Sequence, residues 1–302
     1  MSLPRRIRPG TSYLITRTTR SRRFFLSPDD TGVAVIFWFC IAVAAAITGV
    51  AISAVCVMST HIHLVVTDVR GELPRFTHWL FRHSAVCLKL LRGIDENVWS
   101  SDKANYTELL TNDAVIAAIA YTLSNPTTSG LVPHAHKWPG AISSADDLRG
   151  TVRIAEVPKQ FFSKLWTPQR LRFSMPPSLA QTYSTDDAVA LIKKQLRRIE
   201  RAKLIELRAH GRAFLGIDKV LKVRHTSRPE NRRPRRPGSR VPTLKTVSRA
   251  AMKDAIEGLR EFRTAYAEAL EAWRAGKDAT FPPGTWWMAR LSKTRVKVTP
   301  AA

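Results

Sequence analysis

AVCVMSTHIHLVV, the run at residues 54–66, is typical of a buried β-strand. Side chains alternate between the two faces of a strand. We therefore expect His61 and His63 on one face, with Ile62 and Leu64 on the other face and directed into a core. Two imidazoles side by side on a strand can share one divalent metal ion. The run thus predicts both a strand of the central sheet and a candidate metal site.

The composition fits a folded chain of one large domain or two ordinary ones, with 302 residues of which 44% are hydrophobic. That hydrophobic share supports a packed core and excludes a globally disordered chain. The cysteines Cys40, Cys56 and Cys87 have no paired spacing. They argue against a disulfide framework or a zinc ribbon and favour a reducing, cytoplasmic location.

Positive charge is concentrated in the second half of the chain. Residues 1–150 hold 15 Lys and Arg against 11 Asp and Glu, whereas residues 151–302 hold 33 against 13. The total of +24 therefore divides into +4 and +20. A polycationic half is typical of a protein that binds nucleic acid through phosphate contacts, although it can also be a solvated surface that keeps a chain soluble.

A long uncharged segment, residues 31–60, has the length and hydropathy of a transmembrane helix. We favour a buried helix followed by a buried strand. Thr48-Gly49 interrupts the apolar run as a helix C-terminus would, and the residues after it alternate and lead to the histidines. A spanning helix would also place Arg17–Arg23 and the His pair on opposite sides of a bilayer. We therefore expect no membrane partner.

Strands and helices are expected to alternate in the first half of the chain. The patterns predict strands over residues 12–16 and 51–66, an apolar helix from a cap at Ser27 to Ile47, helices over 73–92 and 114–124, and a short helical segment over 105–110. Pro126 is expected to end the helix over 114–124, because the residue before a proline avoids the helical region. These elements predict an α+β fold with one sheet.

The second half is predicted to form a separate, mainly helical region. Small and polar residues at 141–147 mark the boundary, which gives domains over 1–145 and 146–302. Long basic helices are expected over 186–213 and 245–275. Between them, residues 224–242 contain seven arginines and four prolines, and this composition is typical of a flexible basic linker.

The helix before Pro126 carries a candidate catalytic pair. Tyr121 and Asn125 are spaced i and i+4 and therefore share one face of the helix. Tyr121 points away from the apolar stripe that contains Ile119 and Leu123. Asn125 could supply an oxygen ligand to a metal, and Tyr121 a nucleophile. The alternatives are a packed tyrosine, an asparagine that only ends the helix, and two surface histidines on an edge strand.

Taken in order, these motifs resemble the single-tyrosine HUH transposases, and most closely their branch of REP-associated tyrosine transposases. Val57–Leu64 resembles the family's Met-Pro-Asn-His-x-His-Leu, and Tyr121–Val132 resembles its Tyr-Ile-x-x-Asn-Pro-Val-x-x-Gly-Leu-Val. Trp138-Pro139 resembles the family's next motif, so the resemblance covers about residues 4–142. Two departures are Ser59-Thr60, where the family has Pro-Asn or Pro-Glu, and Thr127-Thr128-Ser129, where it has Val-Arg-Ala.

The resemblance implies a ferredoxin-like antiparallel sheet with helices on one face, the HUH domain, in residues 1–145. It implies that His61, His63 and Asn125 bind Mg²⁺ or Mn²⁺. Tyr121 would cleave single-stranded DNA near a hairpin of a repetitive element and form a 5′-phosphotyrosine. The basic second half and six arginines would hold the phosphates: Arg17, Arg20, Arg22, Arg23, Arg75 and Arg82. A homodimer and a nucleoid-associated location in the bacterial cytoplasm are further expectations.

Two other functions stay open at this point. A rolling-circle replication initiator or a relaxase would share the metal site, although the spacing to Tyr121 and the ending Gly130-Leu131-Val132 favour the transposase branch. A catalytically silent, domesticated relative would keep the fold and the basic surface but would bind DNA without cleaving it.

Overall fold

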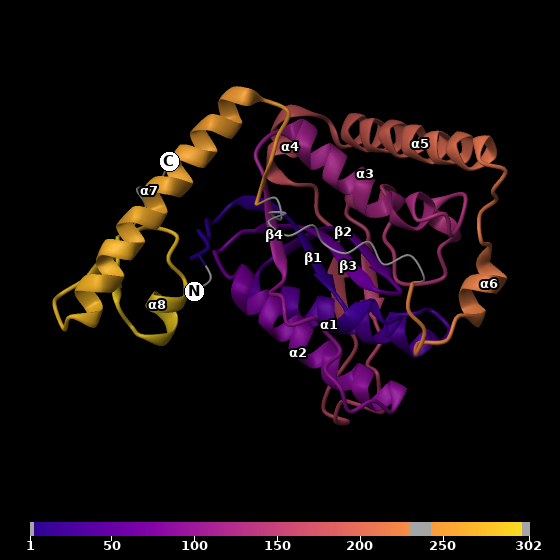
Figure 1. The fold of residues 1–302 in the computed structure, drawn as a ribbon, viewed down its shortest axis with the longest axis horizontal. Coiled ribbons are helices and arrows are strands. Elements are labelled where there is room, and N and C mark those ends of the chain that lie inside the picture. Colours follow the sequence, from indigo (N-terminus) through magenta and orange to yellow (C-terminus); the bar gives the residue numbers. More distant parts are fainter. Residues whose placement is uncertain (1–2, 230–242, 298–302) are drawn as a thin grey trace.

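The computed structural model describes residues 3–229 and 243–297. At its centre lies a mixed five-stranded sheet in the order β2-β3-β1-β4-β7 (Figure 1). The strands are β1 (Thr11–Thr18), β2 (Ala51–Met58), β3 (His61–Asp68), β4 (Asn105–Leu109) and β7 (Leu244–Lys245). Neighbouring strands are antiparallel except β4 and β7, which are parallel. The predicted α+β class is confirmed.

The predicted strand over 51–66 is a hairpin of two strands, β2 and β3. Met58 pairs with His61, so Ser59 and Thr60 form the turn. Every residue of β2 after Ala51 and of β3 after His61 is buried. A strand that is buried on both faces has a nearly continuous apolar sequence, and this continuity hides the turn. The His pair therefore begins a strand.

Residues 105–109 form a strand, so the prediction of a short helix over 105–110 is wrong. β4 pairs antiparallel with β1, with Thr107 opposite Leu14. Tyr106 packs against the core of the sheet. Pairing and burial decide the conformation of this segment, because its own pattern is too short to favour either structure strongly.

Two helices, α1 (Thr31–Thr48) and α2 (Leu73–Arg92), cover one face of the sheet (Figure 1). Ile62 and Leu64 of β3 pack into this core with Phe37 of α1 and Phe76 of α2. α1 is long and apolar enough to cross a membrane by length and composition. In the fold Phe37 is fully buried, which is how a core helix packs.

The start of α1 differs by a few residues from the prediction. The cap is Asp30, whose side chain accepts a hydrogen bond from the backbone nitrogen of Gly32 at 2.7 Å. Ser27, the predicted cap, is buried before the helix begins. Asp30 satisfies one of the free N–H groups that every helix start presents.

The other face of the sheet is covered by α3 (Asn112–Thr128), and α5 (Thr185–Ala209) packs on α3 (Figure 1). Leu14 and Val65 of the sheet meet Ile119 of α3, and Ile192 of α5 completes this second core. The expectation of helices on one face only is therefore wrong. Both faces of the sheet carry apolar side chains, so each requires a covering layer.

α3 continues through Pro126 instead of ending before it. The proline lies in the last turns of the helix, where it removes one N–H and so one hydrogen bond. The backbone nitrogen of Ser129 donates to the carbonyl oxygen of Asn125 at 3.0 Å, so the helical bonding resumes beyond the proline. Asn125 is consequently held inside the helix and not at a frayed end.

Residues beyond 145 contribute to both cores. Phe173, which follows β6 (Gln169–Arg172), is fully buried on the α1 side and meets Trp38 edge to face, with ring centroids 6.2 Å apart. On the other face α5 packs on α3, and β7 extends the sheet. The boundary expected near residue 145 therefore does not separate two cores.

The other elements of the described residues are short, except α7. They are β5 (Val152–Ala155), α4 (Pro177–Thr182), α6 (Ile217–Lys222), α7 (Arg249–Arg274), β8 (Thr280–Phe281), α8 (Trp287–Leu291), β9 (Arg295–Val296) and the 3₁₀ turns η1 (Arg20–Arg22), η2 (Ala135–Lys137) and η3 (Asp146–Arg149). α7 projects from the body in Figure 1 and starts later than predicted, because Leu244 and Lys245 pair with β4. Most of the predicted linker, residues 230–242, lies outside the described residues.

Replacing Phe173 by alanine should lower the free energy of unfolding by about 3–5 kcal/mol, because a fully buried ring leaves a cavity. Urea denaturation measures the change. The control is Leu165→Ala at a side chain that is 92% exposed, which should change stability by less than about 0.5 kcal/mol. If residues 1–145 formed an independent core, Phe173→Ala would leave the main unfolding transition in place.

Candidate active site

The two histidines lie at the start of β3 and face α3. His61 and His63 alternate with Ile62, which points to the α1 side, and share their face with Val65, which packs under α3. Their ring centroids are 4.7 Å apart. His63 is buried, with 3% of its surface exposed, and His61 is partly exposed. The alternation predicted from the sequence therefore places both imidazoles on one side of the sheet.

Each imidazole is held at its Nδ1 atom by a threonine hydroxyl. Thr60 Oγ1 lies 2.9 Å from His61 Nδ1, and Thr16 Oγ1 lies 3.1 Å from His63 Nδ1. These contacts orient the rings and leave the Nε2 atoms for another partner. His63 Nε2 is buried and makes no hydrogen bond within the described residues. A buried nitrogen without a partner is costly, and a bound metal ion would satisfy it.

α3 brings Tyr121 and Asn125 to the same place. The ring of Tyr121 meets the ring of His63 edge to face, with centroids 5.2 Å apart and planes at 83°. The Nδ2 atom of Asn125 donates to the Tyr121 carbonyl oxygen at 2.8 Å. A side-chain hydrogen bond between Asn125 and His61 opposes the lowering of the His61 pKa, so the amide lies within reach of this imidazole. β3 and α3, which are distant in sequence, thus bring the four predicted residues together.

Burial keeps both imidazoles neutral, so that they bind a proton only at acid pH. It lowers the pKa of His61 to about 4, against an opposing hydrogen bond from Asn125 and with a smaller contribution from the Arg22 charge. Burial also lowers the pKa of His63 well below its usual value, and the neighbouring His61 adds to this effect. A neutral imidazole presents the lone pair that a metal ion requires.

Tyr121 is the accessible member of the group, with 41% of its surface exposed. Partial burial raises the pKa of its phenol, and the hydrogen bond with Asn125 opposes this effect. The phenol is therefore reachable by a substrate but needs help to lose its proton near neutral pH.

The six predicted arginines are scattered over the molecule. Arg20 and Arg23 pair with Glu96 at 3.6 and 2.7 Å. Arg17 lies over the rings of Phe81 and Trp99, at 4.9 and 5.6 Å from their centroids. In contrast, Arg22 is exposed near His61. Arg75 and Arg82 are exposed on α2, on the opposite side of the sheet from the histidines. Arg22 is therefore the predicted arginine that the fold places at the site.

Three residues of the site were missed by sequence reasoning: Thr16, Thr60 and Lys245. Thr16 lies opposite His63 in the register of β1 and β3, so the signal existed once that pairing was known. Thr60 is one of the two residues, directly before the His pair, that depart from the family motif there. Lys245 Nζ lies 5.7 Å from the centroid of the Tyr121 ring, and nothing in the sequence pattern connects it to Tyr121.

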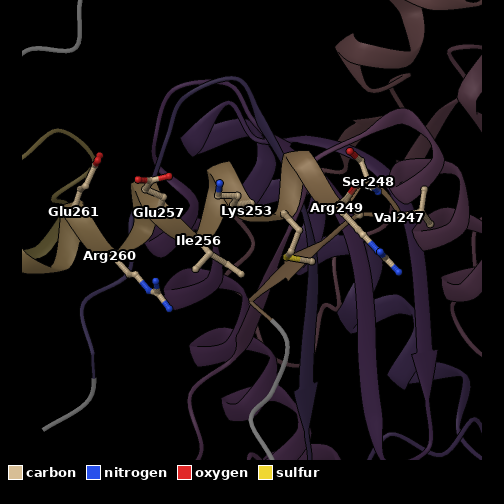
Figure 2. A pocket seen from close by; sticks show the side chains of 10 residues that line it. Val247, Ser248, Arg249, Lys253, Ile256, Glu257, Arg260 and Glu261 are labelled. Atoms are coloured by element: carbon tan, nitrogen blue, oxygen red, sulfur yellow. Dashed lines mark hydrogen bonds between the residues drawn. The ribbon is translucent and has the colours of Figure 1, made fainter.

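Two surface cavities of the described residues have no histidine of the pair in their lining. One, of about 740 Å³, runs along α7 beside Lys253, Ile256 and Arg260 (Figure 2). Another, of about 540 Å³, lies beside α5 and Phe214. It is lined by four cations of α5, here called the α5 basic face: Lys194, Arg197, Arg198 and Arg201. These spacings put the four charges on one side of the helix.

The acidic residue that lines this cavity, Glu200, is bonded to the loop that follows α3. Glu200 accepts a hydrogen bond from the Ala135 backbone nitrogen at 2.8 Å and lies 3.0 Å from His134 Nδ1. The α5 basic face is therefore available to an anion. Within the described residues there is no cluster of three or more His, Cys, Asp or Glu that could hold a metal. Beside the His pair, the Asn125 side chain is a neutral group whose amide oxygen is of a type that binds divalent ions.

Comparison with solved structures found a protein of distantly similar fold. No protein-family model matches the sequence, and the search of curated proteins found no match. Among solved structures, a REP-associated tyrosine transposase bound to a REP hairpin is similar, with 18% sequence identity and a TM-score of 0.41. The match covers 55% of this chain and 92% of that one. Because the likeness is distant, the proposals below rest on side-chain geometry and on the sequence motifs.

Lowering the pH should destabilise the metal-free protein through the two histidines. Their folded pKa values lie below the usual 6.5, so the unfolded state binds more protons. Their contribution to stability is complete above about pH 6.5 and is lost as the pH falls toward the folded pKa of His61, about 4. Each histidine adds a slope of at most about 1.4 kcal/mol per pH unit.

Chemical denaturation in EDTA between pH 7 and pH 5 measures this slope. The matched variant is His61→Gln/His63→Gln, which keeps polar side chains but removes both titrating groups. It should show a shallower dependence of unfolding free energy on pH. Equal slopes for the two proteins would contradict neutral burial of the imidazoles.

Proposed function

We propose that this protein is a metal-dependent transposase that cleaves and rejoins single-stranded DNA through a 5′-phosphotyrosine on Tyr121. The observation that carries the proposal is the meeting of His61 and His63 from β3 with Tyr121 and Asn125 from α3. The same four residues lie in the motifs that resemble the single-tyrosine HUH transposases. A chance surface pair of histidines would not be oriented by threonines and faced by a tyrosine and an amide.

The order of elements supports the same family. β1, α1, β2, β3, α2 and β4 form a β-α-β-β-α-β unit, and its strands lie in the order β2-β3-β1-β4 with antiparallel neighbours. This order and pairing support a ferredoxin-like fold. α3 then covers the free face of the sheet and supplies the tyrosine. β7 is an addition at the edge.

Mg²⁺ or Mn²⁺ is the ion that the residues fit. His61, His63 and Asn125 would hold it, because His63 Nε2 is buried without a hydrogen-bond partner among the described residues and the Asn125 side chain is hydrogen-bonded to His61. Imidazole nitrogens with an amide oxygen and water suit both ions. When bound, the ion polarises the scissile phosphate and offsets the charge that develops on it.

The covalent step uses Tyr121 as nucleophile. Its Oη forms a bond to phosphorus as the bond from phosphorus to the 3′ oxygen breaks. The phenol proton passes to water, and the departing 3′ oxygen takes a proton from water to become a hydroxyl. The phosphodiester energy is kept in the phosphotyrosine, so an incoming 3′ hydroxyl can reverse the step on a new strand without a nucleotide cofactor.

Single-stranded DNA with a hairpin is the substrate that fits the motif and the charge. Arg22 is exposed next to His61 and can contact a phosphate near the scissile bond. The α5 basic face lies beyond the C-terminal end of α3, where Glu200 contacts the loop after the helix. Its four cations can hold further phosphates. The homodimer and the cytoplasmic location stay predictions.

Incubation of the protein with labelled single-stranded hairpin DNA and Mn²⁺ should give a covalent protein–DNA adduct on a denaturing gel. Tyr121→Phe should abolish the adduct, because it removes the attacking oxygen, and should leave DNA affinity within about twofold. Tyr266→Phe on α7 is the control and should form the adduct normally. Wild-type protein that binds these hairpins tightly without any adduct would instead be a silent DNA-binding relative.

Mn²⁺ should stabilise the wild-type protein against heat. At a concentration one hundred times its dissociation constant it adds about 2.7 kcal/mol, which corresponds to a rise in Tm of about 5–10 °C. His63→Ala should remove this rise, because it removes a buried ligand. His136→Ala, at an exposed histidine, should keep it. A rise that persists in His63→Ala would place the ion elsewhere.

A further inference from the structure

Lys245 reaches the candidate nucleophile from the second half of the chain. Its ammonium nitrogen lies 5.7 Å from the centroid of the Tyr121 ring, and the His63 ring lies against the same tyrosine. Lys245 is half-buried. The nucleophile is therefore bordered by an imidazole of β3 and by a cation of β7.

The backbone fixes Lys245 on the active-site side of the sheet. It pairs with Leu109 across β4 and β7, and Leu109 packs in the core under α3. Its carbonyl oxygen accepts a hydrogen bond from the backbone nitrogen of Leu110 at 3.0 Å. The next residue, Thr246, contacts the hydroxyl of Thr111, the cap of α3, at 3.2 Å. The strand of Lys245 is thus bonded to the helix of Tyr121.

The charge of Lys245 has no acidic partner in the described parts of the chain. No carboxylate there forms an ion pair with it. Partial burial lowers the pKa of its ammonium group, and no acidic group there opposes this effect. A half-buried cation with no counter-ion is costly unless an anion arrives during function. Packing on the tyrosine ring recovers only a part of this cost.

We propose that Lys245 is a catalytic residue, whose ammonium contacts a non-bridging oxygen of the phosphoryl group as it is transferred to Tyr121. This inference rests on the proposed function. As Oη bonds to phosphorus and the 3′ oxygen departs, negative charge grows on the non-bridging oxygens. Lys245 stays protonated and offsets that charge from beside the tyrosine ring. No proton of Lys245 is consumed.

The position of Lys245 fits a phosphoryl contact better than a purely structural one. A lysine that served only to pack on the ring would gain little over an uncharged side chain of similar length, such as glutamine or methionine. A cation beside a nucleophile, in contrast, attracts the anionic group that the nucleophile attacks, and fixed charges of this kind are among the largest contributions to catalysis.

The test compares the rate of adduct formation by Lys245→Gln and wild-type protein on two versions of one hairpin DNA. One version has the normal scissile phosphate, and the other has a methylphosphonate there, which lacks the negative charge. Lys245→Gln should be slower by roughly 100-fold on the phosphate and within about threefold of wild type on the methylphosphonate. Lys245→Arg, which keeps the charge, should recover much of the rate on the phosphate.

The control for the charge change is Lys253→Gln, at an exposed lysine of α7 (Figure 2), which should match wild type on both substrates. Equal rates for wild type and Lys245→Gln on the phosphate would overturn the inference. An equal loss on both substrates, with no recovery by arginine, would make Lys245 a structural residue and would also overturn it. If wild-type protein forms no adduct with the phosphate, the proposed function itself fails.

Discussion

The burial of β3 on both of its faces is the constraint on which the site depends. This strand lies between β1 and β2, with α1 and α2 against one face and α3 against the other. Any polar side chain on it must find partners inside the protein. His61 and His63 do so through Thr60, Thr16 and Asn125, and His63 Nε2 is left without a hydrogen-bond partner among the described residues.

Local periodicity was enough to predict the parts of the site that lie within one element. The alternation of a strand placed His61 and His63 together, and the helical repeat placed Tyr121 and Asn125 on one face. The bounds of α2 agree with the prediction because its apolar stripe and flanking signals are clear. Periodicity did not predict the turn at Ser59-Thr60 or the strand β4, because the pairing of strands in the sheet determines both. Lys245 could not be found without the tertiary fold.

Net charge alone does not indicate which cations are free to bind an anion. Of the arginines near the start of the chain, Arg20 and Arg23 share one carboxylate, Glu96, and Arg17 is packed over aromatic rings. The α5 basic face is different, because its single neighbouring carboxylate, Glu200, is bound to another loop. Availability of the charge, more than its amount, separates a contact surface from a solvated one.

The position of the edge strand β7 in the sequence affects how the nascent chain assembles its candidate active site. β1 to α3 leave the ribosome early, and they already contain the histidines, the tyrosine and the asparagine. β7 joins this sheet only after all of α5 has been made, because it follows α5 in the chain. A nascent chain would therefore hold an incomplete centre while it is still tethered. If Lys245 has the proposed role, the order of synthesis would complete the centre only once β7 has been made.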